Sequence, residues 1–549
     1  MLSVFISLLR CFVFISILGN SETGMTFTSD GPSVLTKAYL AMVPELDVGS
    51  KDAGYLHLTT SSATTTDAWV NAGSKKLHQN VKSGETASLE LPKQVILTGG
   101  SVRKANAFTL VTTKDLGVFF RNEWTFYQMR ELSQLPFTYT VVSYSDAADP
   151  MLSVIGISVV FDATKLTLTF REGINVTNVL GSVPKGKVKG QQLEFSKQSH
   201  RINIKLESDE DLTGTTIESS HVIAVIAGSM SVDNSTRSVY VDHMTTRNAG
   251  SEYIVFGLPG IGANYTVRVV AKSPDTSVTL DYNQPITLTD AGDFTDMSFS
   301  RGSFHMLTAS SEIVVAIFLK NGGPRKTDMV IVHPVNSSTT SKYQFSIPSL
   351  SGDVNFKHYL VVTTDSSRQT SMVLNGQALP QETVWVPIPG TSHVGGYVPL
   401  VDTVQAQVIS TTDGSYFNAY LMGYGDDATY GSALEGIDTP QEDTSDLQFT
   451  MNKTFCERTG QTGNYISNGT QMEITKVTSR KNRRFLSYRS LHRTTLHLQA
   501  CQLTCFLYSD CIGVNYKTVS SSTEINCDII LKGDGCTLKG SGWTRYNLK

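Results

Sequence analysis

The segment "ASSEIVVAIFLKN", residues 309–321, decides the fold. It begins with small polar residues and continues through β-branched and aromatic side chains, which is typical of a strand buried in a sheet. The same phrase returns as "LVTTKDLGVFFRN" at 110–122, "ESSHVIAVIAG" at 218–228 and "STTDGSYFNAYLMGY" at 410–424. The copies are 107, 91 and 101 residues apart, counted between Thr113, Ser220, Ser311 and Thr412. The chain therefore contains an internal repeat of about one hundred residues.

Two more phrases recur in the same order, an aromatic strand and a polar turn that leads into a strand. The aromatic strand carries Tyr39, Tyr139, Tyr253 and Tyr343. We therefore predict an all-β tandem repeat region of four β-sandwich-like units, each about one hundred residues long. The units span about residues 37–122, 137–228, 251–321 and 341–424. A closed propeller-like ring of all the copies is the alternative, because sequence periodicity does not separate the two architectures.

Helical periodicity is weak between residues 25 and 425. The best helical candidate is "NEWTFYQMRELSQLP" at 122–136, where we expect a single helix. One helix leaves the all-β class unchanged.

The first 21 residues have the order of a secretory signal peptide. Arg10 precedes the apolar run "CFVFISIL", and the small or polar residues Gly19, Asn20 and Ser21 follow it. We assign residues 1–21 to this signal, and Cys11 is removed with it. The longest later apolar run, "IVVAIFL" at 313–319, is far shorter than the ~20 residues of a transmembrane helix. We therefore expect a secreted, extracellular protein without a transmembrane segment.

Charge divides the chain near residue 450. Residues 450–549 hold 14 Lys and Arg against 6 Asp and Glu, a net charge of +8, while the whole chain carries -4. Such a shift usually marks a domain boundary. We predict a β-repeat region over 22–435, an acidic linker over 436–449 and a second domain over 450–549. The acidic stretch has no EF-hand spacing, so a spacer is favoured over a calcium site.

The repeat phrases resemble the N-terminal domain of IgGFc-binding proteins. The resemblance rests on "SSHVIAVIAG…YVDHM…SEYIVFGLP", "SSEIVVAIFLKN…TDMVIVHPV…SKYQFSIPS", "FKHYLVVTTD" and "YFNAYLMGYGDDATYGSAL", and it covers about residues 25–435. It implies an extracellular, non-enzymatic protein of mucus or cell surfaces. The family usually places a cysteine before the Asp-His pair, whereas Val241 stands there in this chain. The antibody-Fc binding that gives the family its name is not carried over.

Six sequons fit a secreted glycoprotein. They are Asn175, Asn234, Asn264, Asn336, Asn452 and Asn468.

No catalytic or cofactor motif is present, so we predict no catalytic residue, cofactor or metal site. The chain has no G-x-S-x-G elbow, no H-E-x-x-H motif and no P-loop. "GLPGIGANYT" at 257–266 holds Gly260 and Gly262 but lacks the third glycine of a dinucleotide site, so we interpret it as a loop. Asp242 and His243 are adjacent, yet strand neighbours point to opposite faces, which favours a structural role over a general base.

Six cysteines remain in the mature chain, and all lie in the C-terminal region. They are Cys456, Cys501, Cys505, Cys511, Cys527 and Cys536. Cys501 and Cys505 are i and i+4 on a predicted helix, with His497 and His492 nearby, so a zinc site is one alternative. A redox site is another, but it normally uses Cys-x-x-Cys. An even number of cysteines in a secreted chain favours three disulfides.

The cysteine module resembles the PAN/apple family, a small disulfide-bonded α+β domain. The match is Ala500-Cys501-x-x-x-Cys505-x-x-x-x-x-Cys511, then Tyr516, then Cys527 followed by Ile529. The resemblance implies the bridges Cys501–Cys527, Cys505–Cys511 and Cys456–Cys536. It also implies protein or carbohydrate binding without catalysis. The long interval between Cys456 and Cys501 departs from the family pattern.

A basic cluster lies inside that interval. Its residues are Arg480, Lys481, Arg483, Arg484, Arg489 and Arg493. Three interpretations stay open: a solvated loop, a contact for anionic glycans, or a convertase processing site. Nucleic acid is not an expected partner of an exported protein.

The sequence thus predicts a secreted, non-enzymatic glycoprotein for extracellular recognition or adhesion, with a protein or carbohydrate ligand. The alternatives are a structural matrix or mucus component that self-associates, and an unrecognised extracellular hydrolase. The oligomeric state and the identity of the ligand stay open.

Overall fold

The computed structural model is nearly all β, which confirms the predicted class, and its strands are antiparallel apart from one short parallel pair. The structure describes residues 37–41, 43–44, 54–72, 75–97, 100–112, 114, 116–122, 125–144, 151–159, 161, 163–175, 187–198, 202–231, 239–244, 249–260, 265–281, 283–320, 327–337, 340–348, 356–401, 403, 405–425, 429–436, 464–467, 470–473, 511–518, 525–531 and 543–547.

The chain divides into two compact units. One comprises Leu35–Val160 and Thr164–Thr439 and is called the β body here. The other comprises Met1–Val34, Phe161–Ala163 and Pro440–Lys549.

The β body begins with two pairs of sheets, called the first and second sandwich. The first consists of β1 Lys37–Ala41, β3 Tyr55–Thr59, β4 Thr66–Ala72, β5 Lys75–Val81, β6 Thr86–Glu90, β9 Phe108–Thr112, β10 Gly117–Arg121 and β11 Phe126–Gln128. Its connections hold β2 Val43–Pro44, β7 Ile96–Leu97, β8 Val102–Lys104 and the 3₁₀ turns η1 Lys93–Val95 and η2 Leu132–Gln134. The second consists of β12 Thr138–Thr140, β13 Met151–Val159, β14 Thr164–Thr169, β15 Lys187–Lys189, β16 Gln192–Gln198, β17 Asn203–Ser208, β18 Thr216–Ser219, β19 Ile223–Ser231 and β20 Val239–His243.

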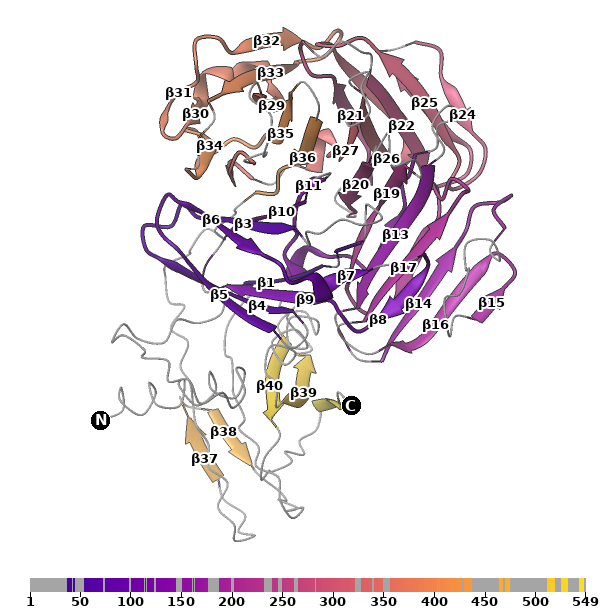
Figure 1. The fold of residues 1–549 in the computed structure, drawn as a ribbon, viewed down its shortest axis with the longest axis vertical. Helices are drawn as coiled ribbons and strands as arrows, with labels where there is room; N and C mark the ends of the chain where they lie inside the picture. Colours follow the sequence, from indigo (N-terminus) through magenta and orange to yellow (C-terminus); the bar gives the residue numbers. More distant parts are fainter. Residues whose placement is uncertain are drawn as a thin grey trace. The chain divides into compact units, whose positions relative to one another are not determined.

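Two further repeats, called the third and fourth sandwich, complete the β body (Figure 1). The third consists of β21 Ala249–Phe256, β22 Tyr265–Ala271, β23 Thr276–Leu280, β24 Ile286–Leu288, β25 Phe294–Phe299, β26 Phe304–Lys320 and β27 Thr327–Ile331. The fourth consists of β28 Lys342–Phe345, β29 Lys357–Asp365, β30 Met372–Leu374, β31 Gln377–Ala378, β32 Val384–Pro387, β33 His393–Leu400, β34 Gln407–Thr411, β35 Asn418–Tyr424 and β36 Thr429–Ala433. The 3₁₀ turns η4 Val335–Ser337 and η5 Ser366–Ser371 lie between these strands.

One strand order occurs in all four sandwiches. The first sandwich pairs β1-β9-β4-β5 in one sheet and β11-β10-β3-β6 in the other. The second and fourth repeat this order as β12-β18-β14-β16 with β20-β19-β13-β17, and as β28-β34-β30-β31 with β36-β35-β29-β33. In the third, all seven strands form one sheet, because the 17-residue β26 takes the place of two strands and pairs with β21, β22, β23 and β27. Alternating buried and half-buried residues along β4 and β14 produce this arrangement, because each sheet turns one face to the core.

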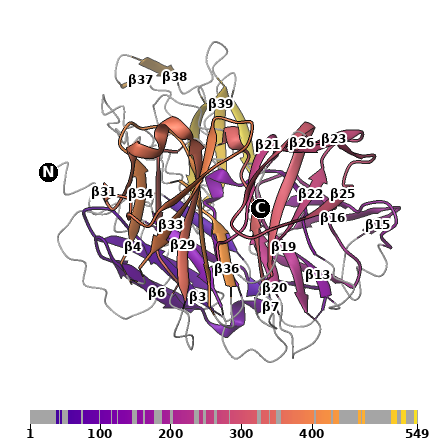
Figure 2. The same ribbon diagram turned by 90° about the horizontal axis from the view of Figure 1, so that it is seen from above.

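The last strands of the four sandwiches meet in the middle of the β body. β27 contacts β20 and β36, and β11 also contacts β20 and β36 (Figure 1). Figure 2 shows β20 and β36 in this middle position from above. Backbone groups are linked to side chains of the neighbouring strand. The Ile331 N–H donates to Asp242 Oδ2 at 2.9 Å, and the Gln128 N–H donates to Ser432 Oγ at 2.9 Å. The fourth sandwich therefore contacts the first as well as the third.

Each hydrophobic core extends into the next sandwich. Phe318 and Met329 of the third sandwich join the core of the second. Tyr397 and Tyr420 of the fourth join the core of the third, and Phe126 of the first joins the core of the fourth. Ile226 of the second sandwich packs into the core of the first. Burial of apolar surface therefore stabilises the contacts between sandwiches as well as each sandwich itself.

Two sequence expectations are wrong. Among the described residues the repeats form open sheets, and no sheet closes into a barrel or a propeller. The helix expected at 122–136 is also absent from that segment's described residues, which form strand β11 and the short 3₁₀ turn η2. Phe126, Tyr127 and Gln128 are all buried where β11 pairs with β10, so tertiary pairing overrides the helical spacing.

The other unit has five described strands. β37 Asn464–Ser467 and β38 Thr470–Glu473 form a hairpin. β39 Cys511–Thr518, β40 Ile525–Leu531 and β41 Trp543–Asn547 form an antiparallel sheet in the order β40-β39-β41. The signal segment 1–21, the helix expected to carry Cys501 and Cys505, and all of the linker except Gly436 lie outside the described residues. The PAN/apple resemblance stays a prediction.

Candidate functional site

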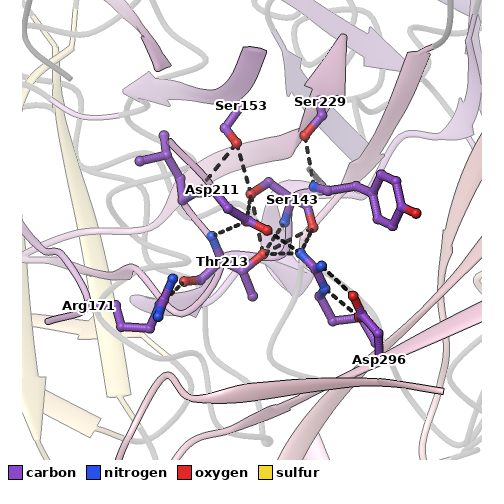
Figure 3. Close-up of polar contacts among 10 residues, drawn as sticks. Ser143, Ser153, Arg171, Asp211, Thr213, Ser229 and Asp296 are labelled. Carbon is purple, nitrogen blue, oxygen red and sulfur yellow. Dashed lines mark hydrogen bonds and ion pairs between the residues drawn. The ribbon is translucent and has the colours of Figure 1, made fainter. Parts of the chain in front are cut away.

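A buried arginine, Arg268, links the second and third sandwiches, and Figure 3 shows its partners Asp211, Thr213 and Asp296. Arg268 on β22 donates from Nε and Nη2 to the two oxygens of Asp296, at 2.8 and 2.7 Å. Its Nη1 donates to Asp211 Oδ2 at 2.6 Å, to the Ser143 carbonyl at 2.7 Å and to Thr213 Oγ1 at 3.0 Å. The guanidinium therefore binds one carboxylate of its own sandwich and three groups of the preceding one.

The surroundings of Arg268 indicate a structural role. Burial lowers the pKa of Arg268, but the hydrogen bonds and charges of Asp296 and Asp211 raise it more, so the net pKa is raised. The guanidinium carbon lies 4.0 Å from the centre of the Phe294 ring, and the side chain is only 2 % exposed. All three guanidinium nitrogens donate hydrogen bonds within the protein, so the network joins the two sandwiches.

A Ser-His-Asp chain lies at the start of β26. His305 Nδ1 is 2.5 Å from Asp281 Oδ2, and His305 Nε2 is 3.0 Å from Ser303 Oγ. This is the order of nucleophile, base and orienting carboxylate in hydrolases. However, Ser303 Oγ donates to the Ser300 carbonyl at 2.6 Å. Because a hydroxyl has one proton, His305 does not accept it in this arrangement. The chain therefore ties the turn before β26 and offers no activated nucleophile.

A cavity of about 270 Å³ lies at one end of the fourth sandwich. Its polar lining comes from the end of β29, from η5, from the start of β33 and from the turn before β35. Ile254 and Val335 of the third sandwich supply the apolar part. The lining residues are Ile254, Val335, Thr363, Thr364, Asp365, Arg368, His393, Tyr416, Phe417 and Asn418. Loops at the end of a rigid sandwich are a common position for binding sites.

Local hydrogen bonds fix the acidic side of the cavity. Asp365 caps η5, because its Oδ1 accepts from the Ser367 N–H at 3.0 Å and from Ser367 Oγ at 2.6 Å. Its Oδ2 accepts from Ser392 Oγ at 2.8 Å. The hydrogen bonds from Ser367 and Ser392 lower the pKa of Asp365 to about 2, so the carboxylate is ionised at neutral pH.

Several lining groups have hydrogen-bonding capacity to spare. Thr364 is 4 % exposed, and its Oγ1 is buried without a partner. His393 Nδ1 is likewise buried without a partner. Arg368 uses Nη1 for the Tyr416 carbonyl at 3.2 Å. The Tyr416 side chain is 53 % exposed. Buried polar atoms are normally paired, so these groups suit a ligand that supplies the missing hydrogen bonds.

The residues predicted from sequence do not meet at this cavity. Asn175 is exposed, and Asp242 is 3 % exposed with its carboxylate on the Ile331 N–H. Cys511 and Cys527 lie on the paired strands β39 and β40. The remaining predicted sites lie outside the described residues or have side chains that the structure does not describe. They are Asn234, His243, Asn264, Asn336, Asn452, Cys456, Asn468, Arg480, Lys481, Arg483, Arg484, Arg489, Arg493, Cys501, Cys505 and Cys536.

The described part of the chain holds no group of three or more His, Cys, Asp or Glu residues placed to bind a metal ion. Within the same part, no helix has the length and apolar character needed to cross a membrane.

The cavity residues were missed because no motif joins them. Asp365, Arg368, His393 and Tyr416 come from three separate turns, which only the sandwich brings together. Two local signals were present in the sequence. "TDSS" at 364–367 is a helix-capping pattern, and Tyr416 is an aromatic residue within the polar turn "DGSYFN".

Comparison with known proteins identifies the family. No curated protein matches the chain. Among solved structures, the chain is similar to the viral chemokine binding protein R17 encoded by rodent gammaherpesvirus Peru, with 8 % identity and a TM-score of 0.13 over 56 % of this chain and 88 % of that one. The model of the family described as IgGFc binding protein matches residues 129–423, more than half of the chain. This chain therefore belongs to the IgGFc binding protein family.

Proposed function

We propose that this protein is a secreted, non-enzymatic glycoprotein that recognises a protein or carbohydrate ligand outside the cell. The family match over residues 129–423 carries the proposal, because the family is named for a binding activity. The open, polar cavity at the end of the fourth sandwich gives the β body a place to bind. The signal segment 1–21 and the six sequons support secretion and glycosylation.

The C-terminal region 450–549 is the second part of the proposal. Its six cysteines favour three disulfides in an oxidising compartment, with the pairing implied by the PAN/apple resemblance. The basic cluster around Arg483 and Arg484 is a contact for an anionic glycan in this proposal, because clustered cations attract polyanions over long range.

The function is tested by binding of the full-length secreted protein to immobilised IgG Fc fragment, mucin-type glycoproteins and a glycan array. We expect saturable binding to at least one of these probes. Measurements at two salt concentrations separate the two binding regions, because screening weakens contacts of exposed charges. Binding that changes neither with salt nor with the Arg483→Gln substitution would argue against the basic cluster as a contact for the ligand. Absence of binding to every probe would overturn the recognition function.

The non-enzymatic part has its own test. The geometry of Ser303, His305 and Asp281 makes a serine-directed fluorophosphonate the appropriate probe. We expect no labelling, because the Ser303 proton is held by the Ser300 carbonyl. Labelling that disappears in Ser303→Ala would show an enzyme.

A further inference from the structure

We propose that the cavity at the end of the fourth sandwich binds one neutral pyranose residue, the terminal sugar of a glycan. This inference rests on the proposed recognition function and names the ligand class of its site. The volume of about 270 Å³ suits one small group, since pockets for drug-sized ligands start at ~300 Å³. One sugar at the end of a glycan is a group of this size.

The polar lining selects a hydroxyl-rich group. Arg368 only donates hydrogen bonds and the ionised Asp365 only accepts them, whereas Thr364 Oγ1 does both. An ammonium group cannot accept from Arg368, and a carboxylate cannot donate to any of these groups. A sugar hydroxyl donates and accepts, so a polyol satisfies every side of the lining. The opposite charges of Asp365 and Arg368 also offset each other, which favours a neutral occupant over an ion.

Two residues of the lining have a buried polar atom without a hydrogen-bond partner. Thr364 and His393 both line the cavity, and Thr364 Oγ1 and His393 Nδ1 are unpaired within the protein. Leaving such an atom unpaired costs about 1–3 kcal/mol, so a ligand that pairs them gains affinity.

The remaining wall suits the apolar face of a sugar ring. The half-exposed Tyr416 ring lines the cavity together with Ile254 and Val335. An aromatic ring offers a large apolar face and adds a polar hydroxyl at its tip. A pyranose has the matching composition, with C–H groups on its faces and hydroxyls around its rim.

The experiment measures binding of methyl glycosides of neutral hexoses, fucose and N-acetylhexosamines, with sialic acid and glucuronic acid as acidic probes. Binding to the full-length protein is followed by ligand-observed NMR, because affinities near 1 mM are expected for single sugars. We expect a neutral sugar to bind. Thr364→Val should weaken it roughly 3- to 10-fold through loss of a hydrogen bond, and Tyr416→Ala should weaken it by a similar factor.

Thr383→Val is the matched control. Thr383 lies in the same sandwich and also has a buried, unpartnered Oγ1, but it does not line the cavity. We expect Thr383→Val to bind the sugar as the natural protein does. Equal sugar affinity in Thr364→Val and the natural protein would overturn the site. Selective binding of an acidic sugar, or binding of protein probes alone, would overturn the neutral-sugar assignment and leave the recognition function standing. Absence of binding to every sugar and protein probe would overturn both the sugar site and the recognition function.

Discussion

At the scale of single residues, Arg268 shows how charge is used inside the β body. Its partner Asp211 has a side chain that is 14 % exposed, while its other partner, Asp296, is 38 % exposed. Burial raises the pKa of Asp211, but Arg268 and the hydrogen bonds from Thr213 and Ser143 lower it more, and the net pKa lies below the ordinary 3.8. Asp211 therefore favours the folded state in its ionised form.

This shift predicts how stability depends on pH. The unfolded Asp211 carboxyl takes up its proton first as pH falls, so its stabilising contribution is complete above about pH 4–5 and is lost as pH falls through the lower folded pKa. Asp211→Asn should lower the free energy of unfolding by about 2 kcal/mol at pH 7. The difference from the natural protein should narrow below pH 4. Urea unfolding between pH 7 and pH 2.5 measures both effects.

Asp296→Asn is the control for this prediction. Solvent screens the more exposed Asp296, so its replacement should cost less, below about 1 kcal/mol. A difference between Asp211→Asn and the natural protein that stays constant down to pH 2.5 would contradict the assigned pKa shift.

The residues of the cavity mark the limit of what single-residue patterns predict. Asp365 and Ser367 form a helix cap that the sequence alone can suggest, because the two partners are only two residues apart in the chain. The approach of His393 and Tyr416 to the same cavity depends on pairing between β29, β33 and β35. No local sequence pattern indicates that residues so far apart in the chain line one cavity.

At the scale of elements, the alternation of apolar and polar residues predicted strands correctly, whereas the helical spacing at 122–136 predicted a helix that the described residues do not form. "YTVRVVA" at 265–271 coincides with β22, and "KLTLTF" at 165–170 lies within one residue of β14. β14 alternates between buried and more exposed residues, whereas six of the seven residues of β22 are buried. β11 is short and buried on every described side chain, so it lacks the alternation that identifies a strand. Its partner strands decide its conformation.

The turns of the second and third sandwiches approach each other closely at Gly214 and Gly292, which leads to a testable prediction. Gly214 precedes β18 and has a φ of +85°, and an added Cβ would lie 2.1 Å from the Gly292 carbonyl oxygen of the third sandwich. Gly214→Ala should therefore force two backbones apart next to the Arg268 network. We expect a cost of about 1–3 kcal/mol beyond the backbone strain itself, measured as a lower midpoint of thermal unfolding.

Gly173→Ala isolates the steric part of this effect. Gly173 has a φ of +86°, and an added Cβ would meet nothing within 4 Å. Both substitutions carry the same left-handed strain of about 1–2 kcal/mol, so their difference reports the contact with Gly292. Equal destabilisation by the two variants would argue against a close approach of the sandwiches at this point.

At the scale of the whole β body, the contact between the first and fourth sandwiches could not be predicted from the repeats. Repeated phrases indicate four similar units, but they do not say whether the last unit returns to the first. The structure joins them through Gln344 on β28, whose Nε2 donates to the Thr59 carbonyl and whose Oε1 accepts from the Ser61 N–H at 2.7 Å. Nearly 300 residues of chain separate these partners.

A cycle of shared cores predicts cooperative unfolding of the β body. In a linear repeat array, damage at one interface stays near that interface. Here each core includes residues of two sandwiches, and the fourth sandwich also contacts the first.

Gln344→Ala leaves polar groups of Thr59 and Ser61 without this partner, which costs about 1–3 kcal/mol. We expect amide exchange to accelerate in all four sandwiches, including the second and third. Gln377→Ala, on the exposed edge strand of the same sheet, should change nothing. Faster exchange confined to the first and fourth sandwiches would mean that the units unfold independently, because a cooperative body transmits the loss of one interface to every core.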